Sequence, residues 1–139
     1  MEGAASSRET GEFLLAQGAR SVMLEPIGYI GFFSRTPRVF DLGGHVSRDV
    51  FEYRRSGRPS WFFDAVERFE PEFIVLREGE VERNLGWYVG VLFPGESERT
   101  DWLRRYQIAA KYGLNGGGEK LVVWRRVTVA GPSQQPWRK

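Results

Sequence analysis

The sequence contains no cysteine and a single histidine among its 139 residues. The absence of cysteine excludes disulfide bonds, thiolate metal sites and cysteine nucleophiles, but it leaves the cellular compartment open. No apolar run approaches the roughly 18 residues that a membrane-spanning helix needs, and the first residues do not resemble a signal peptide. On this basis we expect the chain, as given, to be soluble.

The sequence also lacks a strong excess of charge of either sign. Lysine and arginine number 20 against 18 aspartates and glutamates, so the net charge of +2 does not identify a polyanionic partner. With 41% hydrophobic and 27% charged residues, the composition is that of a globular domain. We predict a flexible leader over residues 1–9, a single α/β domain over residues 10–129, and a flexible tail over residues 130–139.

The stretch from Ser21 to Ser47 predicts a compact strand–helix–strand unit. The apolar run Val22–Leu24 stops at Glu25-Pro26, because proline has no backbone N–H and favours an extended predecessor. Pro26 suits the first position of a helix that extends to about residue 34, and Arg38–Asp41 follows as a second short strand. Two strands joined in this way are expected to be parallel with a right-handed crossover.

The remaining pattern alternates helices and strands. Thr10 can cap a helix that ends at Gly18, and Ser47 and Ser60 can cap the next two. Residues 77–100 are the least regular part. The other predicted elements are helices over 48–56 and 61–69, strands over 73–76, 101–112 and 120–129, and a glycine-rich turn over 114–119. We therefore predict a three-layer α/β fold, with a short, mostly parallel sheet, an antiparallel C-terminal hairpin and helices on the faces.

Glu25, Asp41 and His45 are the residues with catalytic character. The two acids lie where strands end, and that edge of an open α/β sheet is where ligands bind. Together with the histidine they could bind a metal or act as general acid and base, as in a small hydrolase. The alternative is that both acids cap the turns beside them, which is the commoner role of aspartate in such places. Gly28 and Gly31 match neither a dinucleotide fingerprint nor a P-loop, so we predict no cofactor.

A basic stripe is predicted on the segment that starts at Ser47. Its arginines are interleaved with aromatic residues, which suits single-stranded nucleic acid or anionic lipid headgroups. An ordinary solvated face over a hydrophobic core remains the third interpretation. The stripe consists of Arg48, Arg54, Arg55 and Arg58, and the aromatic residues are Phe51, Tyr53, Trp61 and Phe62.

The runs Leu24–Phe33 and Val39–Ser47 resemble the soluble C-terminal domain of bacterial polytopic membrane glycosyltransferases of the GT-C type. This group is related to protein mannosyltransferases and takes sugars from polyprenyl phosphate donors. Pro71–Arg77 matches a further strand of that domain in the right order, and two later segments, Tyr106–Gly113 and Leu121–Arg126, resemble its closing strands. One departure is His45, which stands where the group usually has an apolar residue.

The resemblance implies that this chain is an accessory domain and not itself catalytic. The catalytic acid of such enzymes lies in their membrane part, and the soluble domain lies on the extracytoplasmic face. The domain would position the acceptor or the lipid-linked sugar donor, with the membrane-embedded part of the enzyme as its partner. Glu25, Asp41 and His45 would then line a groove at the strand ends, and Arg54, Arg55 and Arg58 would contact lipid or donor phosphates. Nucleic acid is the less favoured partner.

Overall fold

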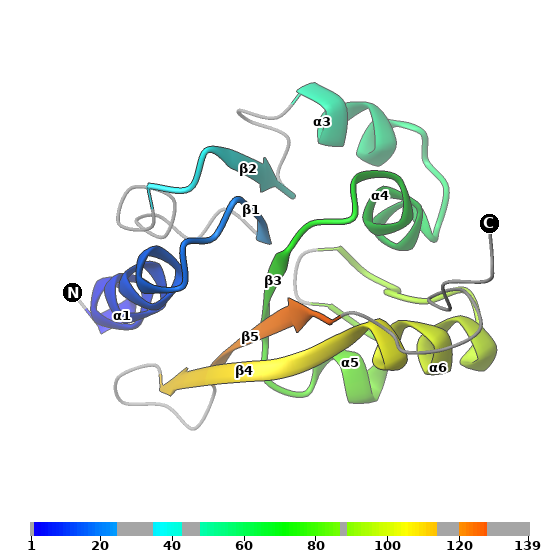
Figure 1. The fold of residues 1–139 in the computed structure, drawn as a ribbon. Coiled ribbons are helices and arrows are strands. Elements are labelled where there is room, and N and C mark those ends of the chain that lie inside the picture. Colours follow the sequence, from blue (N-terminus) through cyan, green and yellow to red (C-terminus); the bar gives the residue numbers. More distant parts are fainter. Residues whose placement is uncertain (1, 25–34, 43–47, 87–88, 114–119, 128–139) are drawn as a thin grey trace, which may run out of the picture.

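The computed structural model describes residues 2–24, 35–42, 48–86, 89–113 and 120–127. These residues form a mixed sheet with helices on its faces (Figure 1). The strands are β1 (Ser21–Leu24), β2 (Arg38–Asp41), β3 (Phe73–Arg77), β4 (Tyr106–Gly113) and β5 (Lys120–Arg126). The helices are α1 (Glu2–Ala16), α3 (Arg48–Arg55), α4 (Trp61–Phe69), α5 (Glu80–Arg83) and α6 (Glu96–Arg105). None of the described helices is long and apolar enough to cross a membrane.

The sheet has the strand order β2-β1-β3-β5-β4. β1 is parallel to both β2 and β3, with Val22 opposite Val39 on one side and Phe73 on the other. β5 is antiparallel to β3 and to β4. The predicted combination of parallel strands with an antiparallel C-terminal hairpin is therefore confirmed.

Alternating residues of β3 face two separate hydrophobic cores. Phe73 and Val75 pack with α1, whereas Ile74 and Leu76 pack with the layer that contains α4 and α6. All four side chains are almost completely buried, as expected for a strand covered on both faces. Figure 1 shows α1 apart from the other helices, and the predicted three-layer arrangement is confirmed.

The core between α1 and the sheet is the smaller of the two, and the core that contains α4 and α6 is the larger. The last turn of α1 covers the smaller core. Leu14 is completely buried there, and the ring of Phe13 meets that of Phe73 edge-on at 6.3 Å between centroids. The helix then stops at a glycine, as the sequence predicts. Gly18 has φ +66°, and the N–H of Ala19 donates to the Leu14 carbonyl, so the chain turns directly into β1.

The predicted start of the first helix was wrong, and one predicted capping side chain makes no cap. α1 begins at Glu2 and not at Thr10, so it takes in the segment assigned to a flexible leader. The residues before Thr10 include two alanines and no proline, so nothing in them stops a helix. Ser60 occupies the N-cap position of α4 as predicted, but its side chain donates and accepts no capping hydrogen bond with the described residues.

The part expected to be irregular contains α5 and the first half of α6, and the strand expected from Asp101 begins only at Tyr106. α6 is hard to predict because Trp102 is its one buried residue, which leaves no apolar periodicity. The signals for this helix in the sequence are electrostatic instead. Glutamates occupy its first turn and arginines its last, which matches the helix dipole.

Asn84 orders the segment between α5 and α6. It ends α5 in the left-handed conformation with φ +55°. Its side-chain amide donates to the Phe93 carbonyl at 3.0 Å and accepts from the Phe93 N–H at 2.7 Å, like a piece of neighbouring strand. These two bonds hold Leu92 and Phe93 in the larger core, where both are completely buried.

Several predictions fall outside the described residues. They are the helix after Pro26, the cap at Ser47, the glycine-rich turn over 114–119 and the tail over 130–139. The last strand, predicted over 120–129, ends at Arg126 in the structure.

We predict that α1 is an integral layer of the fold and not an appendage. Leu14→Ala should lower the free energy of unfolding by about 2–5 kcal/mol, because it leaves a cavity in the smaller core. The adjacent Leu15 is 50% exposed, so Leu15→Ala should change stability by no more than about 0.5 kcal/mol. Urea unfolding of the two variants measures the difference. Equal, small losses would show that α1 contributes little to the fold.

Candidate functional site

Of the three residues predicted at the strand ends, the structure describes one. Asp41 is the last residue of β2, lies opposite Leu24 of β1 and is 5% exposed. Glu25 and His45 lie outside the described residues. Within the part of the chain that is described, no three histidine or acidic side chains lie together in a way that could hold a metal ion.

Three of the four arginines of the predicted basic stripe lie at or just after the end of α3, and the side chain of Arg48 lies outside the described part of the chain. Arg54 and Arg55 form the last turn of the helix, and Arg58 follows in the connection to α4; all three are exposed. We call these three residues the α3 arginines. The Arg58 Nε donates a hydrogen bond to Asp64 at 2.8 Å. Phe51, which lies one turn before Arg54, is 44% exposed.

The prediction that Trp61 and Phe62 lie on the surface beside these arginines was wrong. Trp61 and Phe62 belong to the larger core and are 8% and 0% exposed. They are the first residues of α4, whose apolar side faces the sheet, so burial takes precedence over display on the surface. Of the four aromatic residues predicted for the stripe, only Phe51 and Tyr53 are therefore accessible at the surface.

A groove lies on the inner side of α3. It has a volume of about 540 Å³ and opens beside the first residues of β1 and β2, at the end of these strands opposite to the one predicted. Its lining comes from β1, β2, α3 and α4: Ser21, Arg38, Phe40, Asp49, Glu52, Tyr53, Arg68 and Phe69.

Three aromatic rings form one side of this groove. Phe40 stacks on Phe69 at 4.8 Å between centroids, and Tyr53 meets Phe69 edge-on at 5.6 Å. Phe40 is 4% exposed, whereas Tyr53 and Phe69 are half-buried. The guanidinium groups of Arg38 and Arg68 lie over the Phe40 and Phe69 rings, at 4.9 and 5.6 Å. Cation–π contact holds both arginines at the edge of the groove.

The groove continues along α3 toward the connection with α4. A second hollow of about 500 Å³ shares Glu52 and Tyr53 with the first and is also lined by Ser56, Arg58 and Asp64. We call the two hollows together the α3–α4 groove. An arginine–aspartate pair lies near each end of it: Arg38 with Asp49 at 3.1 Å, and Arg58 with Asp64 at 2.8 Å.

Sequence reasoning missed the α3–α4 groove. Asp49, Glu52 and Tyr53 of α3 line it at helical spacing, and Ser56 directly after the helix continues the same row. A mostly polar face at that spacing is ordinarily a solvated one, so the pattern alone gives no reason to expect a groove.

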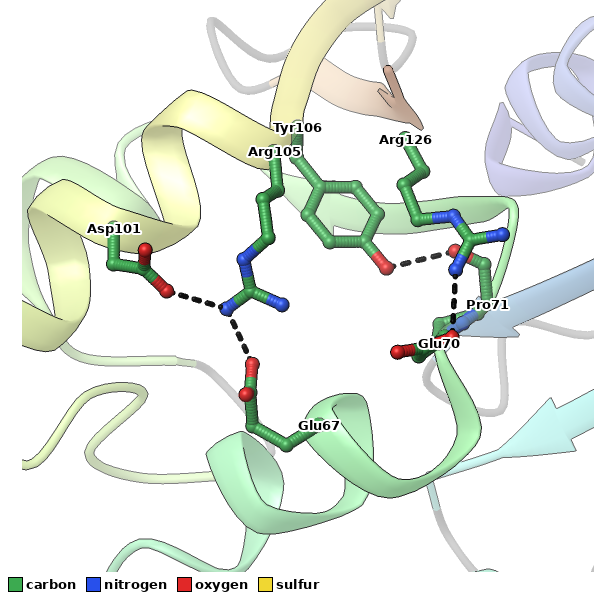
Figure 2. Close-up of polar contacts among 7 residues, drawn as sticks. All are labelled: Glu67, Glu70, Pro71, Asp101, Arg105, Tyr106 and Arg126. Carbon is green, nitrogen blue, oxygen red and sulfur yellow. Dashed lines mark hydrogen bonds and ion pairs between the residues drawn. The ribbon is translucent and has the colours of Figure 1, made fainter. Parts of the chain in front are cut away.

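A second polar cluster ties α4 to α6 and to the C-terminal hairpin (Figure 2). Arg105 pairs with Glu67 and, at 3.0 Å, with Asp101. Arg126 pairs with Glu70 at 3.1 Å, and the Tyr106 hydroxyl donates to the Pro71 carbonyl at 2.8 Å. The partners on the α4 side all lie in its last turn or directly after it, so the cluster fixes how α4 ends.

Burial and neighbouring charges shift the pKa values of two residues in this cluster, Tyr106 and Arg105. Burial raises the pKa of Tyr106 well above its ordinary value of 10.0, against the neighbouring Arg126 and Arg105, which lower it. Burial lowers the pKa of Arg105, but the hydrogen bond and charge of Glu67, together with the charges of Asp101 and Tyr106, outweigh burial, so that pKa is raised overall. Both groups keep their protons at neutral pH and serve as structural contacts.

Comparison with known protein families gives one match for this chain. The family model for a domain of unknown function (DUF8728) matches residues 2–131. The chain belongs to this family. The DUF8728 match covers every helix and strand that the structure describes. Comparisons with curated proteins and with solved structures found no match.

The raised pKa of Tyr106 predicts a loss of stability at high pH. Below about pH 10 the tyrosine is protonated in both states, and above it the unfolded state loses its proton first, which favours unfolding. Between about pH 9 and about pH 11, wild type should therefore lose about 1.4 kcal/mol more than Tyr106→Phe. Urea unfolding at the two pH values measures both losses. Each protein is compared with itself at pH 9, which removes the effect of the lost hydrogen bond. Equal losses would show that Tyr106 does not titrate differently on folding.

Proposed function

We propose that this chain is an accessory soluble domain of a membrane-bound glycosyltransferase. It positions the acceptor or the lipid-linked sugar donor and is not itself catalytic. One observation supports this proposal: four of the segments that resemble the C-terminal domain of GT-C enzymes contain most of β2, β3, β4 and β5, which lie in one sheet.

In this proposal the α3 arginines face phosphate groups of lipids or of the donor. A guanidinium can bind phosphate oxygens through two parallel hydrogen bonds, which suits arginine better than lysine for this contact. Arg54 and Arg55 are exposed at the end of α3, beside the partly exposed Phe51. An aromatic side chain next to a basic group is typical of surfaces that rest on a bilayer interface.

Arg58 would also contact a phosphate group, which would replace Asp64 as its partner. Its side chain is 66% exposed, and its pair with Asp64 is an ion pair of the kind that contributes only about 0–1 kcal/mol. A phosphate group with more acceptor oxygens can replace such a partner at little cost.

The rest of the enzyme supplies the chemistry in this proposal. The catalytic acid would lie in the membrane-embedded part, which is the expected partner, and this domain would lie on the extracytoplasmic face. The hydrolase alternative needs Glu25 and His45, which the structure does not describe. The nucleic-acid alternative needs exposed rings beside the arginines, and two of its four aromatic residues are buried.

The proposal predicts binding to anionic membranes through α3. The purified chain should co-sediment with vesicles that contain phosphatidylglycerol and not with phosphatidylcholine vesicles. Each arginine near an anionic surface contributes about 1 kcal/mol, so Arg54→Gln combined with Arg55→Gln should weaken binding about 10- to 30-fold.

The matched control removes two positive charges elsewhere. Arg83 and Arg104 are exposed in the last turns of α5 and α6, and Figure 1 shows both helices on the far side of the domain from α3. Arg83→Gln combined with Arg104→Gln should bind like wild type. If both double variants lose affinity equally, the attraction comes from net charge, and the role proposed for the α3 arginines is wrong.

A further inference from the structure

The charges that line the α3–α4 groove are balanced. Three arginines, Arg38, Arg58 and Arg68, face three acids, Asp49, Glu52 and Asp64. Two of the arginines lie directly beside acids, in the pairs of Arg38 with Asp49 and of Arg58 with Asp64. A phosphate or a nucleic acid would therefore meet repulsion beside attraction, and the groove favours a ligand without net charge.

Such a lining suits a ligand that is rich in hydroxyl groups. A carboxylate only accepts hydrogen bonds and a guanidinium only donates them, whereas a hydroxyl does both. The pair of Arg38 with Asp49 therefore offers a donor and an acceptor side by side, which matches two neighbouring hydroxyls. Both side chains of this pair are about 60% exposed (59% and 60%), so the pair itself is weak and can open for a ligand.

The aromatic side of the groove completes the match. The half-buried rings of Tyr53 and Phe69 line the groove between the two arginine–aspartate pairs. The face of an aromatic ring carries negative partial charge and attracts C–H groups of positive partial charge, such as those on one side of a sugar ring. The volume of about 540 Å³ lies within the usual range of small-molecule sites, about 300–1,000 Å³.

We propose that the α3–α4 groove binds an uncharged sugar chain, held by the arginine–acid pairs and by the ring of Tyr53. The choice of a sugar among neutral hydroxylated ligands rests on the proposed function. The end of α3 and its inner side then bind different chemical groups. Arg54 and Arg55 at its end meet phosphate, while Asp49, Glu52 and Tyr53 on its inner side hold the sugar.

The test is an NMR titration of the full, ¹⁵N-labelled chain with three neutral probes: mannotriose, maltotriose and chitotriose, each at millimolar concentration. At least one sugar should shift the amide signals of Glu52 and Tyr53 and the side-chain Nε signals of Arg38 and Arg68. Glu52→Gln and Arg68→Gln should each weaken that sugar about tenfold, because each removes a charge-assisted hydrogen bond.

Matched control variants make the same substitutions outside the groove. Glu82→Gln on α5 and Arg104→Gln on α6 change exposed side chains and should leave the affinity within about twofold. Spectra of all four variants away from the substitution should match wild type, which confirms that they fold.

Three results would overturn the inference: no shift in the groove with any of the sugars, equal loss of affinity in groove and control variants, or stronger shifts in the groove with inorganic phosphate than with sugar. None of them affects the vesicle experiment, which depends on Arg54 and Arg55. Failure of the sugar site and failure of the membrane surface can therefore be told apart.

Discussion

The burial of β3 on both faces is the constraint on which the rest of the structure depends. This strand lies in the middle of the sheet, parallel to β1 and antiparallel to β5, so it joins the two halves of the fold. Its alternate side chains must be apolar on both sides, and each side needs its own cover. α1 covers Phe73 and Val75, and the layer of α4 and α6 covers Ile74 and Leu76. Three layers follow from the sequence of one short strand.

The position of α3 is a consequence of this arrangement. α4 lies on the sheet through Phe62 and Val66, and its end is fixed by contacts to the C-terminal hairpin, as Figure 2 shows. α3 then packs beside α4, and Asp49 near its start pairs with Arg38 of β2. One side of α3 faces the α3–α4 groove with balanced charge, while its exposed end carries Arg54 and Arg55. A single short helix thereby presents two chemically different surfaces.

The sequence predicted the elements whose signals are local. β1, β2 and β3 are short apolar runs bounded by proline, glycine or charge, and α4 has apolar residues at helical spacing. α6 was not predictable because only Trp102 is buried, and the α3–α4 groove was not because it depends on tertiary contacts. Arg38, Glu52 and Arg68 are far apart in the sequence and meet only once the sheet and α4 place α3. Of the predicted strand-end site, Asp41 is the residue that the structure describes.

The most direct test of the account is the size and location of the natural gene product. An epitope tag inserted in the chromosome at the 3′ end of the gene reports both, by immunoblotting of cell fractions. The account predicts a tagged product much larger than 16.0 kDa that stays in the membrane after a carbonate wash. A tagged product near 16.0 kDa in the soluble fraction would contradict the claim that this domain belongs to a membrane glycosyltransferase.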